Sequence, residues 1–287
     1  MNANEDTGPG PGRLTPYTRL DEVLAGHAST LRSVLGDTFV GLYPLGSLAI
    51  GDFDLTSDVD FMVVTSDELD DEDVDHVQAA HVQRIDEDTR WVKHLEYSFI
   101  SLHKLHAKSS PYVTDGRRNA ADDRLLWYFN NGADTLERSD HDNTLVSRWT
   151  LRYRSRAVLG PEPATFAPTV TPAELRREIR SSMLGWEQLV LRDASPFDNR
   201  FHQVFLVLNN CRALQDLHEG RITSKKDGAE WGRRHLDAEW HSLIDYCWEE
   251  RRDTGIHVSQ PADPEAFQRT IAFMVYTTRL AEAYRLP

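Results

Sequence analysis

The chain has 287 residues, of which 40% are hydrophobic and 27% charged, a composition typical of a folded protein with room for two domains. Its formal net charge of -14 disfavours nucleic-acid partners, because such binding depends on Lys and Arg neutralising phosphates. No apolar run reaches the roughly 20 residues that span a bilayer and no leader pattern opens the chain, so we expect a cytoplasmic protein with no membrane partner.

The acidic composition favours a small cationic partner, although an acidic surface can also serve solubility alone. Two cysteines, Cys211 and Cys247, fall within helical apolar patterns and are expected to be buried, reduced thiols. We expect the protein to be a monomer.

The first elements along the chain are a polar tail and a helix. Residues 1–16 contain the run Gly8-Pro9-Gly10-Pro11 and are predicted to be disordered, since they cannot bury enough apolar surface to become ordered. Apolar residues then recur every three or four positions over residues 17–35, which predicts an amphipathic helix.

Three β-rich runs follow, at residues 38–45, 59–64 and 94–101. Residues 46–52 contain the glycines of a turn and leave room for a short helix between the first two runs. A helix-like pattern through Val77 and Ile85 precedes the third run. Strands interleaved with helices predict an α/β layered domain over residues 17–160.

The segment Gly160-Pro161-Glu162-Pro163 predicts a domain boundary, because the patterns before it alternate between strand and helix and those after it are helical. Thr171-Pro172-Ala173-Glu174 has the residues of a helix start, with proline at the first helical position. Further helical patterns run to the end of the chain, the last over residues 264–284. We therefore predict a helical bundle over residues 161–287.

Two carboxylates lie at the start of the second β-rich run, in Asp58-Val59-Asp60. Residues two apart on a strand face the same way, so Asp58 and Asp60 should share one face while Val59 enters the core. Paired carboxylates repel unless a cation compensates them, and hard oxygen ligands suit Mg2+. This pattern predicts a site for a metal-bound nucleotide.

A third carboxylate, Glu96, lies on the third β-rich run, between the apolar residues Leu95 and Tyr97. If that strand neighbours the Asp58 and Asp60 strand, three carboxylates converge. Such a group suits metal-assisted phosphoryl transfer, in which a carboxylate accepts the proton of the attacking hydroxyl.

Gly46 and Ser47 complete the pattern at the turn between the first two strands. Glycine lets the backbone approach a phosphate closely, and serine adds a hydroxyl donor. Taken singly, a Gly-Ser turn, an Asp-x-Asp pair or a lone glutamate is more often structural, and only their combination favours a nucleotide site.

The segments Leu45-Gly46-Ser47 and Ser57-Asp58-Val59-Asp60-Phe61 resemble the signature of the nucleotidyltransferase superfamily. A later block resembles the aminoglycoside adenylyltransferases that act on streptomycin and spectinomycin: Leu208-Asn209-Asn210-Cys211-Arg212, then Gly220-Arg221-Ile222-Thr223-Ser224-Lys225-Lys226-Asp227, then Trp231. The resemblance covers most of the chain from about Leu20. It implies an α/β (α+β) domain with a mixed sheet flanked by helices, followed by an all-α helical bundle.

The resemblance also implies roles for individual residues. Asp58, Asp60 and Glu96 would hold Mg2+, with Glu96 also acting as the base, and Arg212 and Lys225 would reach the ATP phosphates across the domain cleft. The implied reaction transfers AMP from ATP to a hydroxyl of a small cationic acceptor, most simply an aminoglycoside, and releases pyrophosphate.

The acceptor region departs from the relatives, which place an aromatic residue of the first domain and acidic residues of the second around the antibiotic. The corresponding first-domain segment, residues 138–145, has no stacking tryptophan, and His202 replaces an expected acidic contact. Candidates for a different acceptor surface are polar or aromatic: Asp140, Asp142, Trp186, Glu187, Asp198 and Trp231. Two alternatives therefore stay open, a nucleotidyltransferase with a non-aminoglycoside acceptor and a catalytically silent nucleotide-binding module.

Overall fold

The structure is a computed structural model, and it describes residues 13–286 except 56, 86–90, 92–93, 109, 113–114, 117–121 and 252–259. The chain divides into two compact units, residues 1–109 with 120–169, and residues 110–119 with 170–287. The predicted boundary at residue 160 falls within the first unit. The segment after it stays with that unit because Tyr43 donates to the Pro161 carbonyl over 3.0 Å and Arg152 donates to the Ala167 carbonyl.

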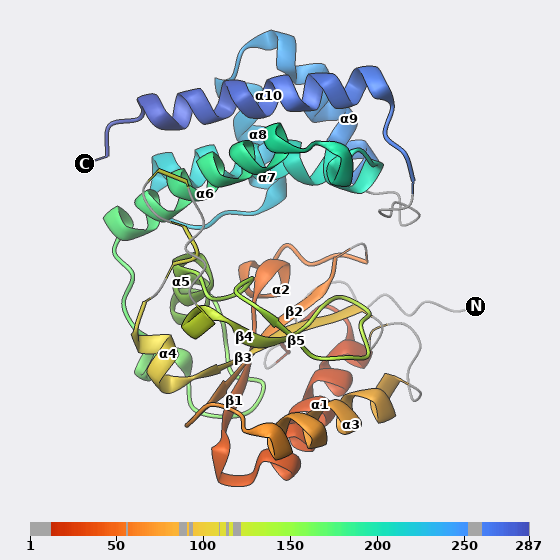
Figure 1. The fold of residues 1–287 in the computed structure, drawn as a ribbon, viewed down its shortest axis with the longest axis vertical. Coiled ribbons are helices and arrows are strands. Elements are labelled where there is room, and N and C mark those ends of the chain that lie inside the picture. The colour runs from red at the N-terminus through yellow and green to blue at the C-terminus, as the bar shows by residue number, and fades with distance from the viewer. Residues whose placement is uncertain are drawn as a thin grey trace. The chain divides into compact units, whose positions relative to one another are not determined.

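The first unit contains a five-stranded sheet in the order β1-β2-β3-β4-β5 (Figure 1). The strands are β1 (Phe39–Pro44), β2 (Val59–Thr65), β3 (Leu95–Ser101), β4 (Leu126–Phe129) and β5 (Glu137–Ser139). Strands β2 and β3 are parallel and every other neighbouring pair is antiparallel. The sheet is therefore mixed, as predicted, and the first three strands coincide with the three β-rich runs.

The α-helices described in this unit are α1 (Thr18–Leu35), α2 (Gly46–Ile50), α3 (Asp71–Ile85), α4 (Leu102–His106) and α5 (Leu145–Tyr153). Helices α1 and α3 lie side by side along the sheet (Figure 1). The apolar face of α1 and Val77 of α3 form one buried cluster with Val59, Phe61 and Tyr97. This cluster accounts for the α1 and α3 patterns seen in the sequence.

The opposite face of the sheet is also buried. Met62 and Val64 of β2 and Ile100 of β3 form a second cluster that includes Leu151 of α5. Because side chains alternate along a strand, Asp60 lies on this second face, away from Val59 and Phe61. Asp60 is thus held at one end of a strand whose remaining side chains are packed on both sides.

The prediction of a disordered tail over residues 1–16 is wrong for residues 13–16, which the structure describes. Residues 1–12 lie outside the described residues, but Thr15 is only 1% exposed. Its amide donates to Asp21 Oδ1 over 2.9 Å, and the Arg13 guanidinium donates to the Thr18 hydroxyl over 2.6 Å. The correction to residues 13–16 has a simple cause, since the polar groups at the start of α1 bind the preceding backbone.

The second unit is helical over its described residues from Val170 onward. Its α-helices are α6 (Pro172–Arg192), α7 (Arg200–Glu219), α8 (Lys225–His235), α9 (His241–Arg251) and α10 (Pro264–Ala283). Helix α6 begins as predicted: the Thr171 hydroxyl accepts from the Glu174 amide while the Glu174 carboxylate accepts from the Thr171 amide. Helix α7 lies at the centre and contacts α6, α8, α9 and α10.

Cys211 and Cys247 are both buried as free thiols within this unit, as expected. Burial raises the pKa of the Cys211 thiol to about 12, so the thiolate is disfavoured at neutral pH. Across the described residues, no helix combines the length and the apolar character that crossing a membrane requires.

Candidate active site

Asp60 and Glu96 lie directly opposite each other on the parallel strands β2 and β3. Side chains at paired positions of neighbouring strands stand about 5 Å apart at their Cβ atoms, so these two carboxylates face the same region. Each is half-buried. The predicted site depended on one condition, that the strand of Glu96 lies next to the strand that begins after Asp58 and contains Asp60. The pairing of β2 with β3 confirms this condition.

Gly46, the first residue of α2, fits closely against Asp60. Its φ of +48° lies in the left-handed region, and a Cβ atom at this position would lie 1.9 Å from Asp60 Oδ2. The neighbouring Leu45 amide donates to the Asp60 backbone carbonyl over 2.8 Å. Glycine is therefore required here for two reasons, the backbone conformation and the close approach to the carboxylate.

The hydroxyl of Ser47 is buried and has no hydrogen-bond partner among the described residues. A buried hydroxyl without a partner costs free energy, so such a group is usually satisfied by a water or a ligand. Its position beside Gly46, in the first turn of α2, fits the predicted contact with a phosphate.

Asp58 precedes β2 and accepts a hydrogen bond at Oδ1 from the side-chain amide of Asn131. Asn131 follows β4, so the contact joins two segments 73 residues apart in the sequence. The Asp58 carboxylate is thus oriented by a partner that the local sequence around it does not reveal.

Glu96 is held by two aromatic residues. The Tyr128 hydroxyl donates to Glu96 Oε1 over 2.5 Å, and His141 Nε2 lies 3.3 Å from the same oxygen. The two rings stack with centroids 5.3 Å apart and an interplanar angle of 25°. The stacked rings of Tyr128 on β4 and His141 after β5 therefore lie on one side of the Glu96 carboxylate.

Burial raises the pKa of the Glu96 carboxyl, while the charge of His141 and the hydrogen bond from Tyr128 oppose that effect. The negative charges of Asp58 and Asp142 raise the pKa further. Asp142 is anchored nearby, where its Oδ2 accepts a hydrogen bond from the Ser98 hydroxyl over 2.6 Å. Several carboxylates therefore interact electrostatically around Glu96.

Such a concentration of negative charge fits a divalent cation. Within the described part of the chain, no three His, Cys, Asp or Glu side chains already stand in a metal-ligating arrangement. Mg2+ commonly needs only one or two protein carboxylates, because waters and substrate phosphates fill its other positions. Asp60 and Glu96, adjacent in register with Asp58 close by, are oxygen donors of the right kind and number.

Arg212 and Lys225 lie in the second unit, at the junction of α7 and α8. Lys225 is the first residue of α8, which Ser224 caps by accepting from the Asp227 amide. A Cβ atom on Gly228 of α8 would lie 2.6 Å from Arg212 Cα, so the two helices cross closely at this point. The structure brings the two predicted cations to one pair of packed helices.

Asp216 connects α7 to the start of α8 by hydrogen bonds. It lies one turn after Arg212 on α7, and its Oδ1 accepts from the amide and the hydroxyl of Thr223, over 2.8 and 2.6 Å. Thr223 in turn precedes the cap of α8. A buried carboxylate thus links the helix of Arg212 to the helix start that carries Lys225.

The remaining acceptor candidates have ordinary packing roles where contacts are seen. Trp186 packs against Phe197 and Phe205, and Trp231 stacks on His235 with centroids 4.6 Å apart. Asp142, another of these candidates, interacts electrostatically with Glu96 in the first unit.

Reasoning from the sequence missed Tyr128, His141 and Asn131 as site residues. The run Leu126-Trp127-Tyr128-Phe129 is an apolar, aromatic strand signal, and it could have revealed β4. Nothing local indicates that β4 pairs with β3, and this pairing is what brings the Tyr128 hydroxyl to Glu96.

Two comparisons with known proteins found a match, one in sequence and one in fold. Residues 166–276 match the family model described as aminoglycoside adenylyltransferase, C-terminal domain. Among solved structures, the chain is similar to the spectinomycin adenyltransferase AAD(9) from Enterococcus faecialis, crystallised with ATP and spectinomycin, with a TM-score of 0.65 and 15% sequence identity. The match covers 93% of this chain and 100% of that one. No curated protein sequence matches the chain significantly.

The structural match shows that the chain has a fold similar to that of AAD(9) over nearly its whole length. The family match confirms, for residues 166–276, the predicted resemblance in sequence to the aminoglycoside adenylyltransferases.

Proposed function

We propose that the protein transfers AMP from ATP to a hydroxyl group of a small cationic acceptor of the aminoglycoside type, in a Mg2+-dependent reaction that releases pyrophosphate. The observation that carries the proposal is the register of Asp60 and Glu96 on parallel strands, with Gly46 seated against Asp60. The relative AAD(9) was crystallised with ATP and spectinomycin, which supports the choice of nucleotide and acceptor class.

In this reaction the acceptor oxygen forms a bond to the α-phosphorus of ATP, and the bond from that phosphorus to the pyrophosphate oxygen breaks. Glu96 would take the proton of the acceptor hydroxyl, a role for which a carboxyl with a raised pKa is well suited. Tyr128 would keep the carboxylate oriented by donating to one oxygen.

Asp58, Asp60 and Glu96 would hold Mg2+, which when bound supplies positive charge to the transferring phosphate. The hydroxyl of Ser47, buried and with no partner in the described chain, would donate to a phosphate oxygen. Arg212 and Lys225 would bind further phosphate oxygens, as the resemblance implies, because a triphosphate needs several cations to balance its charge.

We propose that the first unit carries the residues of the phosphoryl-transfer reaction. We propose that the second unit is a helical-bundle domain. The helices packed around α7 and the family match over residues 166–276 support the latter.

The test is pyrophosphate release from MgATP by the purified protein, with streptomycin, spectinomycin and a wider aminoglycoside panel, and with Asp60→Ala as the blank. Release should require both an acceptor and Asp60. Glu96→Gln should bind ATP but lose about 100-fold or more in turnover, since a general base contributes at least that factor. Silence across the panel by a protein that still binds ATP would overturn the aminoglycoside acceptor, and wild-type turnover by Glu96→Gln would overturn its role as base.

A further inference from the structure

The segment that carries His141 lies outside the helices and strands of the described chain. Residues 140–144 connect β5 to α5, and such connecting segments move more than the elements they join unless other contacts hold them. From this segment His141 contacts the Glu96 carboxylate, with Nε2 3.3 Å from Oε1. The contact therefore depends on the groups that fix the segment in place.

The segment is attached in order along β3. His141 lies beside Glu96, and Asp142 Oδ2 accepts from the hydroxyl of Ser98, two residues further along the strand, over 2.6 Å. Because residues two apart on a strand face the same way, both contacts lie on one face of the sheet. Ser98 is only 1% exposed, so the donor of the second contact is shielded from water.

Arg148 provides the next attachment, beyond the end of β3. Arg148 lies on α5, and its side chain is fully buried. Its guanidinium donates to the Lys104 carbonyl over 2.7 Å and to the Leu105 carbonyl over 2.8 Å, both on α4. Helix α4 follows β3 directly, and carbonyls in the last turn of a helix have no partner within it. Arg148 therefore binds the part of the chain that continues β3.

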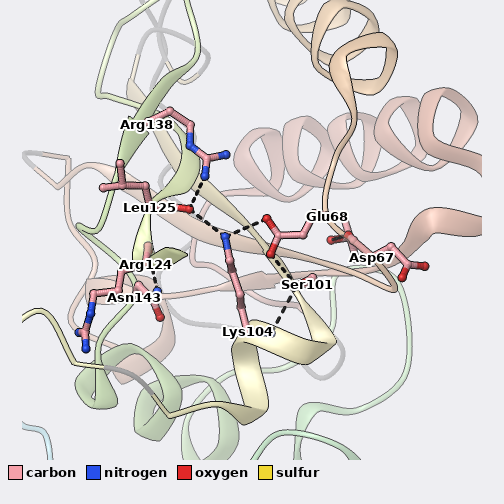
Figure 2. A network of polar contacts seen from close by, with 9 residues as sticks. Asp67, Glu68, Ser101, Lys104, Arg124, Leu125, Arg138 and Asn143 are labelled. Atoms are coloured by element: carbon pink, nitrogen blue, oxygen red, sulfur yellow. Dashed lines mark hydrogen bonds and ion pairs between the residues drawn. The ribbon is translucent and has the colours of Figure 1, made fainter. Parts of the chain in front are cut away.

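The same guanidinium also binds the end of the segment. Its Nη1 atom donates to the Thr144 carbonyl over 2.9 Å, and Nη2 donates to the side-chain oxygen of Asn143 over 2.7 Å. The Asn143 side-chain amide in turn donates to the Arg124 carbonyl over 2.7 Å, as Figure 2 shows. Arg148 thus joins α4 to the segment through all three nitrogen atoms of its guanidinium.

The burial of Arg148 favours a role in orientation. A charged guanidinium is costly to bury, and the cost falls when its donors find oxygen acceptors. An apolar side chain of similar volume would fill the same space without that cost. Hydrogen bonds are directional, however, and fix where the segment lies relative to α4, which apolar packing alone does not.

We propose that Arg148 is a positioning residue for the transfer reaction, an inference that rests on the proposed function. Arg148 fixes the segment 140–144, and the segment places His141 against Glu96. His141 and Tyr128 then keep the Glu96 carboxylate in one orientation towards the acceptor hydroxyl. Because Arg148 is fully buried, it acts through these residues and not by contact with the substrate.

A double-mutant cycle, measured by steady-state pyrophosphate release, tests the proposal. Arg148→Lys keeps the charge but loses the planar fork of donors. It should lower kcat about tenfold and leave the KM for ATP nearly unchanged, because misplacement of a catalytic group by about 1 Å has effects of up to about 100-fold. His141→Ala should lower kcat to a similar extent, and the double variant should be about as slow as the slower single variant. Additive losses, of about 100-fold in the double variant, would overturn the proposal.

Arg152→Lys is the matched control. Arg152 lies one turn further along α5 and also donates to a backbone carbonyl, that of Ala167, which is not part of the carboxylate site. Its kcat should equal wild type, and an equal loss in Arg152→Lys and Arg148→Lys would reduce the effect to general stability. If Arg148→Lys does not fold, Asn143→Ala takes its place in the cycle, since it removes an acceptor of the guanidinium and keeps Arg148 itself.

The ring of His141 gives a readout that needs no turnover. In two-dimensional NMR spectra of the full-length protein, its signal is the one that disappears in His141→Ala. Because the ring stacks on Tyr128, its signal should change in Arg148→Lys and stay unchanged in Arg152→Lys. An unchanged signal in Arg148→Lys overturns the proposal. Absence of turnover in the wild type overturns the proposed function instead, and the His141 signal then decides whether Arg148 positions this residue.

Discussion

At the scale of single residues, the environment of Glu96 combines burial with two polar neighbours. Burial favours the protonated carboxyl, whereas Tyr128 and His141 favour the carboxylate. Both neighbours contact Oε1, so the proposed function leaves the other carboxylate oxygen to accept the proton of the acceptor. The orientation of the proposed base therefore depends on residues from β4 and from the segment after β5.

Tyr128→Phe removes the hydroxyl that donates to Glu96 and keeps the ring stacked on His141. Turnover should fall by about tenfold, the value of one hydrogen bond to a charged group, while the KM for ATP changes little. Steady-state pyrophosphate release measures both quantities. Tyr153→Phe, at a tyrosine that is 48% exposed on α5, is the control and should match wild type. A rise in KM with unchanged kcat would contradict an orienting role.

At the scale of elements, the start of α2 connects backbone geometry to the carboxylate site. Gly46→Ala forces a left-handed residue to carry a Cβ atom that would meet Asp60 Oδ2 at 1.9 Å. We expect turnover to fall by more than about tenfold, because displacement of a carboxylate that is proposed to bind Mg2+ by about 1 Å has effects of this size or larger.

Gly36→Ala is a matched control for this substitution. Gly36 has a similar φ of +54°, but a Cβ atom added there would meet no other atom within 4 Å. Both variants should lose about 1 to 3 kcal/mol of unfolding free energy from backbone strain, measured by urea denaturation. Only Gly46→Ala should lose activity, and an equal loss in both would remove the special role of the contact with Asp60.

The α7 and α8 pair contains a buried acid whose ionisation affects stability. Burial raises the pKa of Asp216 to about 7, although Arg212 and the hydrogen bonds from Thr223 oppose this. A carboxyl with a raised pKa in the folded state contributes stability below its unfolded pKa of about 4, and this contribution is lost as pH rises towards 7.

Asp216→Asn should remove this pH dependence and keep an oxygen that accepts from Thr223. Relative to wild type, the free energy of unfolding of the variant should increase between about pH 4 and pH 7, by at most about 4 kcal/mol. Urea denaturation across this range measures the change. Asp198→Asn, at an exposed aspartate of the same unit, should show no such trend. A constant difference between Asp216→Asn and wild type would show that folding does not raise the pKa of Asp216.

At the scale of the whole molecule, the residues assigned to ATP belong to both compact units. Asp58, Asp60, Glu96, Gly46 and Ser47 lie in the first, and Arg212 and Lys225 lie in the second. The proposed function therefore requires residues of both units, and neither unit alone should bind ATP as the intact chain does.

Arg212→Gln and Lys225→Gln should each weaken ATP binding by about tenfold, because each removes a charged donor to phosphate. Titration of ATP in the presence of Mg2+ measures the affinity. Arg234→Gln, in the last turn of α8, changes the same charge near the opposite end of that helix and should leave affinity unchanged. Equal ATP affinity in all three variants and wild type would remove the second unit from the proposed nucleotide site.

The sequence alone determined the features that depend on local periodicity and capping. Apolar residues three and four apart predicted α1, and alternation predicted that Val59 and Phe61 face one core while Asp60 faces the other way. The glycine and capping signals predicted α2 and the start of α6. These patterns reflect interactions within a few residues, so a single sequence contains them.

Only the tertiary structure decided which distant segments meet. The parallel pairing of β2 with β3 aligned Asp60 with Glu96, and the antiparallel pairing of β3 with β4 brought Tyr128 to the same carboxylate. Asn131 reaches Asp58 across 73 residues. Strand order and register depend on packing of the whole sheet, which no local pattern encodes.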